Sequence, residues 1–137
     1  MTTETDWRTI SISKQSNEAV KRIINDYKYC PFYGSDSIQV LKAAAALAIK
    51  NSIVPVTEFK RETDVTHKGS VNEELQAFMC VIQYSVEPKD DLQYLLDRSA
   101  VTKTFEQYAQ AGLSSLETMC SSMTSMDDFK RMLDESN

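Results

Sequence analysis

The stretch from residue 36 to residue 51, DSIQVLKAAAALAIKN, decides the fold class. From Ile38 to its end, the strongly polar side chains of the helix predicted here are Gln39, Lys42 and Lys50, and four consecutive alanines occupy positions 43–46. A helix that is apolar nearly all round lies inside a packed body, and small side chains let another helix approach it closely. The sequence therefore predicts a mainly α fold built around this helix.

Residues 8–14 have the pattern of a half-buried strand, because polar and apolar side chains alternate strictly. Its apolar face carries Ile10 and Ile12. Its polar face carries three hydroxyl side chains, those of Thr9, Ser11 and Ser13. Residues 1–7 are polar, and we expect them to fray. A lone strand is unstable, so we expect residues 53–56 or the strand of a second protomer to pair with it.

Between this strand and the buried helix, the sequence predicts an amphipathic helix that runs to about Tyr27 and is capped by Ser16 or Asn17. Its apolar stripe recurs at helical spacing and consists of Ala19, Val20, Ile23, Ile24 and Tyr27. We expect Gly34 to form a left-handed turn after it. The cap of the buried helix is then Ser35 or Asp36.

Residues 52–70 are irregular, with room for one short strand, and the rest of the chain is helical by period. Its apolar stripes cover residues 75–82, 92–96 and 101–123, and a last short helix begins at Asp127. Gly112 lies inside the longest stripe, where glycine costs about 1 kcal/mol relative to alanine, so we expect a close contact or a break there.

We predict a single helical domain over residues 1–137, with five or six helices and one or two short N-terminal strands. It divides into a strand-helix-helix unit at residues 8–51, with a ribbon-helix-helix-like start, and an acidic helical part at residues 71–135.

Composition excludes several classes of chemistry. The three glycines of this 137-residue chain are too far apart for a Walker loop or a dinucleotide fingerprint. A single histidine, His67, and three cysteines without Cys-x-x-Cys spacing leave no zinc motif. Paired acids such as Glu73 and Glu74 stand at predicted helix starts, where they complement the helix dipole. We therefore predict no catalytic residue, no metal site and no cofactor, and we do not expect an enzyme.

Charge and hydropathy indicate the compartment and the partners. No stretch reaches 18 apolar residues, and the acidic start is unlike a signal peptide, so we predict a cytoplasmic protein without membrane contact and with reduced cysteines. The net charge of −5 is uneven: residues 1–70 hold ten Lys and Arg against eight Asp and Glu, whereas residues 71–137 hold five against twelve. Any contact with a polyanion therefore belongs to the first half.

The order of elements over residues 8–51 resembles the ribbon-helix-helix family. In that family two protomers pair their strands into a ribbon that enters the DNA major groove, and the second helix starts at a phosphate. This resemblance and the nearby basic residues give nine candidate nucleic-acid-binding residues: Thr9, Ser11, Ser13, Lys14, Lys21, Arg22, Ser35, Lys60 and Arg61. The turn at Gly34 is longer than the family's, and the strand offers no arginine or asparagine for reading bases, so a solvated surface is the alternative.

A second resemblance covers roughly residues 8–120. Tyr108, Ala109, Gly112 and Leu113 form a Tyr-Ala-x-x-Gly-Leu element that follows the short strand, the alanine-rich helix and a basic loop. This order is similar to a family of small bacterial proteins associated with DNA phosphorothioation (Dnd-type) modification and restriction systems. The resemblance implies an accessory role in anti-phage defence near DNA and no known catalytic site.

Two functions follow as hypotheses. The first is a non-enzymatic accessory or adaptor protein of a bacterial DNA-modification-linked defence system, with a larger protein subunit as its partner and duplex DNA as a further contact. The second is a ribbon-helix-helix-type DNA-binding transcriptional regulator. In both cases we expect a homodimer, or docking on a larger partner, through the strand at residues 8–14 and the alanine-rich helix.

Overall fold

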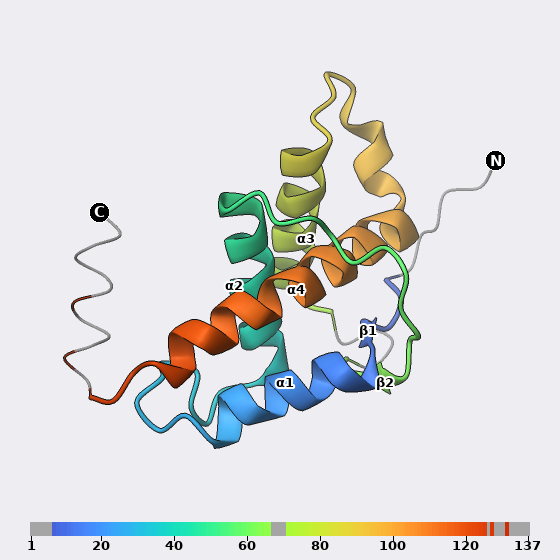
Figure 1. Ribbon diagram of the computed structural model, residues 1–137. Helices are drawn as coiled ribbons and strands as arrows, with labels where there is room; N and C mark the ends of the chain where they lie inside the picture. The colour runs from blue at the N-terminus through green and yellow to red at the C-terminus, as the bar shows by residue number, and fades with distance from the viewer. Residues whose placement is uncertain (1–6, 67–70, 126, 128–130, 132–137) are drawn as a thin grey trace.

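The protein is mainly helical with a small antiparallel sheet, as the computed structural model in Figure 1 shows. The structure describes residues 7–66 and 71–125, together with residues 127 and 131. Its helices are α1 (Lys14–Asn25), α2 (Ser37–Lys50), α3 (Glu73–Val86) and α4 (Arg98–Ser121), and a short 3-10 helix, η1, spans Leu92–Leu96. The sheet pairs β1 (Ser11–Ile12) with β2 (Thr63–Asp64).

The predicted fold class is confirmed in its coarse form, a helical chain with short N-terminal strands. The described residues form four α-helices, fewer than the five or six expected. One reason is that residues 92–96 make a 3-10 turn instead of a longer helix. The other helix, expected from Asp127, falls almost entirely outside the described residues, as does the loop histidine His67.

The tight contact between α2 and α4 forms the centre of the fold (Figure 1). Ala44, Ala45 and Ala48 of α2 are fully buried, and Gly112 of α4 packs against this surface. A Cβ atom added at Gly112 would lie 1.9 Å from the carbonyl oxygen of Ala44. The close contact predicted at Gly112 is thus confirmed. Ala44, Ala45 and Ala48 are taken up by contacts within this chain, whereas Ala46 is exposed, and docking through this helix stays a prediction.

Helix α1 begins earlier than predicted, because Ser13 is its N-cap. The Ser13 hydroxyl accepts a hydrogen bond from the backbone N–H of Ser16 at 3.1 Å, which satisfies a free donor of the first turn. Gly34 has a φ of +78°, so the predicted left-handed turn is present. Asp36, one of the two expected caps, holds the N-cap position of α2.

Residues 52–62 form an extended segment, which we name the strap, that leads from α2 past α4 to β2 (Figure 1). The N–H of Val56 donates to the carbonyl oxygen of Gln107 on α4 at 3.1 Å. The expected pairing of residues 53–56 with β1 is therefore wrong. Residues 63–64 pair with β1 instead, with Ser11 opposite Asp64.

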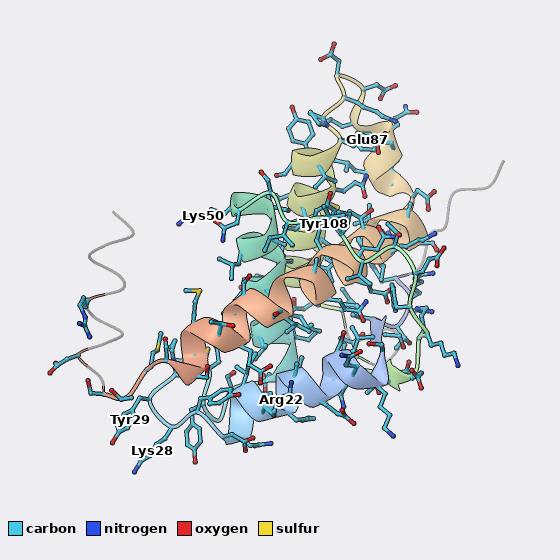
Figure 2. All side chains as sticks on the ribbon, viewed as in Figure 1. Arg22, Lys28, Tyr29, Lys50, Glu87 and Tyr108 are labelled. Carbon is cyan, nitrogen blue, oxygen red and sulfur yellow. The ribbon has the colours of Figure 1, made fainter. Side chains whose placement is uncertain are left out.

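Trp7 packs against the start of α4. Trp7 is buried, and the guanidinium carbon of Arg98 lies 5.3 Å from the centre of its ring, so the expectation of fraying is wrong for this residue. Helices α3 and η1 form a projecting hairpin, which we name the arm, and Figure 2 shows Glu87 near its tip. The Tyr94 hydroxyl donates to the Glu87 carbonyl oxygen at 2.6 Å and ties the two sides of the arm together.

Candidate functional site

A line of buried polar side chains on α4 faces β1. Thr102, Glu106 and Gln110 recur every four residues, so they share one face of the helix, and all three are buried. Glu106 Oε2 accepts from the Ser11 N–H at 2.7 Å, and Gln110 Oε1 accepts from the Ser13 N–H at 2.9 Å. Glu106 and Gln110 take the place that a neighbouring strand would have beside β1, whereas the Thr102 hydroxyl donates to the Arg98 carbonyl oxygen of its own helix.

The other edge of β1 belongs to β2 and the residues next to it. The carbonyl oxygens of Ile10 and Ile12 accept from the N–H groups of Val65 and Glu62, at 2.8 and 3.1 Å. Since α4 satisfies the N–H groups on the opposite edge, both edges of β1 are occupied within the described residues. The strand of a second protomer, as in a ribbon-helix-helix dimer, has no free edge to pair with here.

The predicted polar face of the strand is also not a groove-reading surface. Ser11 is only 2% exposed, and its hydroxyl donates to the carboxylate of Asp64. Ser13 caps α1, and Thr9 is half-buried with its carbonyl oxygen accepting from Arg61 Nη2 at 2.7 Å. The expectation for Ser11 is wrong because the strand is two residues long and lies between α4 and β2.

The remaining candidate residues do not gather in one patch. Five of them are exposed and lie on two separate elements: Lys14, Lys21 and Arg22 on α1, and Lys60 and Arg61 on the strap. Ser35 is half-buried, and within the described residues its buried hydroxyl oxygen has no hydrogen-bond partner. Arg61 is held by Glu106, whose Oε2 accepts from its Nη2 at 2.9 Å.

Arg22 joins α1 to α4 through Glu117. Its Nε and Nη2 donate to the two carboxylate oxygens at 2.5 and 2.9 Å, and the Tyr27 hydroxyl donates to the same carboxylate at 2.7 Å. The bond from Arg22, followed by that from Tyr27, holds the pKa of Glu117 below its ordinary 4.5. The bond to Glu117 raises the pKa of Tyr27 above its ordinary 10.0. Arg22 thus serves a contact between helices.

A cavity of about 480 Å³ lies between the strap and α4, and we name it the strap cavity. Its lining residues are Arg8, Thr57, Glu58, Phe59, Arg61, Lys103 and Glu106. Glu106 is fully buried, and Arg8 Nη2 donates to its Oε1 at 3.2 Å. Sequence reasoning missed Arg8, Lys103 and Glu106 as neighbours. The available signal was a glutamate and a glutamine spaced four apart beside the apolar stripe of a long helix.

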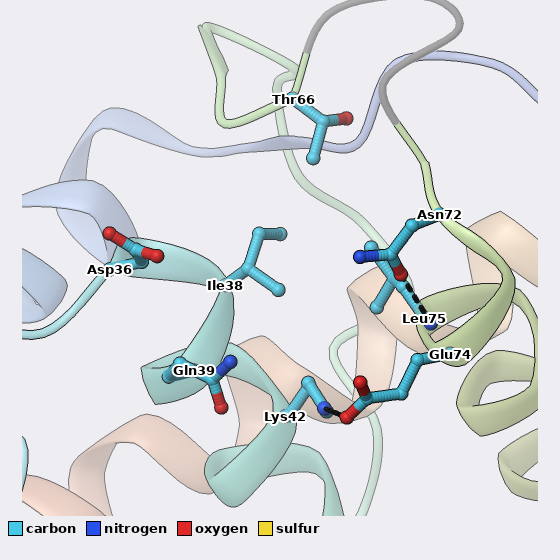
Figure 3. A pocket seen from close by; sticks show the side chains of 8 residues that line it. All are labelled: Asp36, Ile38, Gln39, Lys42, Thr66, Asn72, Glu74 and Leu75. Atoms are coloured by element: carbon cyan, nitrogen blue, oxygen red, sulfur yellow. Dashed lines mark hydrogen bonds and ion pairs between the residues drawn. The ribbon is translucent and has the colours of Figure 1, made fainter.

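A smaller cavity, of about 210 Å³, lies between the starts of α2 and α3 (Figure 3). Lys42 Nζ lies 3.3 Å from Glu74 Oε1 across it, and Asn72 Oδ1 accepts from the Leu75 N–H at 2.9 Å. These groups cap α3 and join it to α2, so this cavity adds no candidate site.

The arm carries apolar side chains on its solvent side. On α3, Ala77, Val81 and Tyr84 follow helical spacing on one face; Val81 is 61% exposed and Tyr84 45%. On η1, Leu92 and Leu96 are also exposed. We name these five residues the arm surface. Exposed carboxylates stand at its two ends, from Glu73, Glu74, Glu87, Asp90 and Asp91.

The described part of the chain contains neither a metal-binding cluster nor a membrane-spanning helix. No three His, Cys, Asp or Glu side chains within the described residues lie close enough together to hold a metal ion. None of the helices in that part has the length and apolar character needed to cross a bilayer.

Comparison of the chain with known protein families, with characterised proteins and with solved structures finds no match.

Proposed function

We propose that the protein is a non-enzymatic accessory or adaptor protein of a bacterial DNA-modification-linked anti-phage defence system. The resemblance over residues 8–120 to Dnd-associated proteins supports a role in anti-phage defence. The arm surface supports the adaptor role. Gly112 of the Tyr-Ala-x-x-Gly-Leu element sits against Ala44, which gives this glycine a packing role.

The arm surface is the observation that carries the proposal. Single exposed apolar residues are ordinary on any protein, whereas a helix stripe of them points to an interaction site. Ala77, Val81 and Tyr84 lie on the face of α3 opposite the core residues Leu75, Met79 and Ile82. Protein interfaces combine such an apolar centre with a polar rim.

The carboxylates at the ends of the arm surface define the chemistry of the partner. Residues 71–137 carry a net charge of −7, and within the arm Lys89 is paired with Glu87 at 3.0 Å. An acidic rim favours a partner with lysine or arginine around an apolar centre, because opposite charges speed association and fix orientation. We therefore propose docking on a basic amphipathic segment of a larger subunit of the defence complex.

The experiment compares two valine substitutions in the full chain. Each subunit of a Dnd-type modification or restriction complex is purified and mixed with the protein, and complex formation is measured by size-exclusion chromatography with light scattering. Val81→Glu on the arm surface should abolish the complex. Val54→Glu is the matched control, since Val54 is 80% exposed on the strap and lies outside the arm.

Three results would contradict the proposal. One is that no subunit forms a complex with the unaltered protein. Another is that Val54→Glu weakens the complex as much as Val81→Glu. The third is that the purified protein has metal-dependent nuclease or nucleotide-hydrolysing activity, since an adaptor needs neither.

A further inference from the structure

We propose that the strap cavity binds a small organic phosphate, with the phosphate held by Arg8, Arg61 and Lys103 and the organic part against Phe59. This site is distinct from the arm surface, and nothing in the adaptor role requires it. The inference rests on the balance of charge in the cavity, on its unused donors and on its size.

Positive charge exceeds negative charge in the strap cavity. Two guanidinium groups, of Arg8 and Arg61, share the single buried carboxylate of Glu106. Lys103 is exposed on α4 and forms no ion pair within the described residues. Glu58, an exposed residue of the strap, carries the only other charge of the lining and is negative. The lining therefore has a net charge of +1 and attracts an anion.

Arg61 retains donors for that anion, and Arg8 adds charge beside it. Arg8 Nη1 donates to Ser99 Oγ and Arg8 Nη2 to Glu106 Oε1, and its Nε is covered by protein, so Arg8 contributes positive charge to the cavity. Within the described residues, Arg61 makes its two hydrogen bonds through Nη2, one to the carbonyl oxygen of Thr9 and one to Glu106, so its Nε and Nη1 are unused there. Guanidinium groups donate in a fixed fork that matches the oxygens of a phosphate, and Lys103 can add a point charge.

The geometry of the cavity favours a small organic ligand over a bare ion or a duplex. Its volume of about 480 Å³ falls within the range of sites for small molecules. Half-buried Phe59 lines it, and an apolar or aromatic group can pack on that ring. A DNA duplex presents its phosphates on a convex surface, which does not enter a cavity under a strap.

Phenyl phosphate is the test ligand, because it combines a phosphate with one aromatic ring. Calorimetric titration of the full chain should give saturable binding that is stronger than for inorganic phosphate or phenol. Lys103→Ala should weaken binding by about tenfold, as expected for loss of one charged contact, whereas Glu58→Gln should strengthen it. Lys21→Ala removes another exposed lysine, on α1 and outside the cavity, and should leave the affinity unchanged.

Several outcomes would overturn the inference. They are no saturable binding of phenyl phosphate, equal affinities of the Lys103→Ala and Lys21→Ala variants, or weaker binding by Glu58→Gln. Tighter binding of a DNA duplex that is lost in Lys103→Ala would also overturn it, because the phosphate would then come from a macromolecule. Lys103 has no ion pair in the described part of the chain, so its variant tests binding without disturbing Glu106.

Discussion

Helix α4 contacts α2 on one side and β1 on the other, and the two contacts are built differently. Toward α2, small residues bring backbone against backbone, with Gly112 beside Ala44. Toward β1, long polar side chains reach out to backbone N–H groups, with Glu106 bonded to Ser11. The contact with α2 requires that Gly112 has no side chain, and the contact with β1 requires the side-chain oxygen of Glu106 as an acceptor. Each should therefore fail under a different kind of substitution.

The largest effect is expected on the polar side, from Glu106→Ala. This change leaves two guanidinium groups without their shared carboxylate and the Ser11 N–H without an acceptor. Breaking a fully buried ion pair costs about 3–5 kcal/mol, and because the guanidinium groups are 30% and 39% exposed we expect the lower end of that range. The free energy of unfolding is measured by urea denaturation. Glu58→Ala is the control, because Glu58 is an exposed carboxylate lining the same cavity. Equal stabilities of the two variants would show that Glu106 does not hold β1.

The next effect is expected on the small-residue side, from Gly112→Ala. The added Cβ would overlap the Ala44 carbonyl, which the helix backbone cannot move away cheaply. Overpacking of this kind costs about 1–3 kcal/mol, and we expect the upper end of that range. Thermal unfolding of this variant is compared with that of Ser114→Ala, a change on the exposed side of α4. A Gly112→Ala variant as stable as Ser114→Ala would refute the tight contact.

Ser13→Ala tests whether the Ser13 hydroxyl stabilises the protein as the N-cap of α1. Loss of an N-cap hydroxyl should destabilise the protein by about 1 kcal/mol. Ser13→Asp should keep most of the stability, because a carboxylate also caps a helix. Both free energies are measured by urea denaturation. An unchanged stability in Ser13→Ala would remove the capping role.

The smallest effect is expected from Glu117→Gln, near the C-terminal end of α4. This change removes the carboxylate to which Arg22 and Tyr27 donate hydrogen bonds. The folded pKa of Glu117 is lowered, so its contribution to stability is present above its ordinary 4.5 and is lost as the pH falls through the folded value. The stability of the unaltered protein should therefore fall more steeply below that pH than that of Glu117→Gln.

Urea denaturation at a series of acidic pH values gives this slope directly. Glu18→Gln on α1 is the control, because Glu18 is exposed. Slopes that are equal for the unaltered protein and Glu117→Gln would show that the carboxylate contributes nothing in this range.

The two sides of α4 also differ in how far the sequence predicted them. The alanines of α2 and the glycine in α4 are local patterns, and helix periodicity translates them directly into a close contact. The partners of β1 could not be found in this way, because Ser11 and Glu106 lie 95 positions apart. Strict alternation from Arg8 to Lys14 predicted a longer strand, whereas a serine cap ends it after two residues.

The strap cavity was missed for the same reason. Arg8, Arg61 and Lys103 come from three separate segments, and only the folded chain brings them together. The arm surface lay within reach of sequence reasoning, because its stripe has helical spacing. It was overlooked because the opposite face of α3 carries the apolar stripe Leu75, Met79 and Ile82. That stripe alone identifies α3 as a helix packed on the core.

The polar contact between β1 and α4 also sets an order of events during synthesis. Residues 11 and 13 emerge early from the ribosome, but their hydrogen-bond acceptors at positions 106 and 110 are made almost a hundred residues later. Contacts so distant in sequence must await closure of a long loop, which slows folding. The edge of the N-terminal strand that faces α4 therefore stays unpaired until most of the chain has been translated, and a product that ends before α4 leaves this edge open to pairing with other chains.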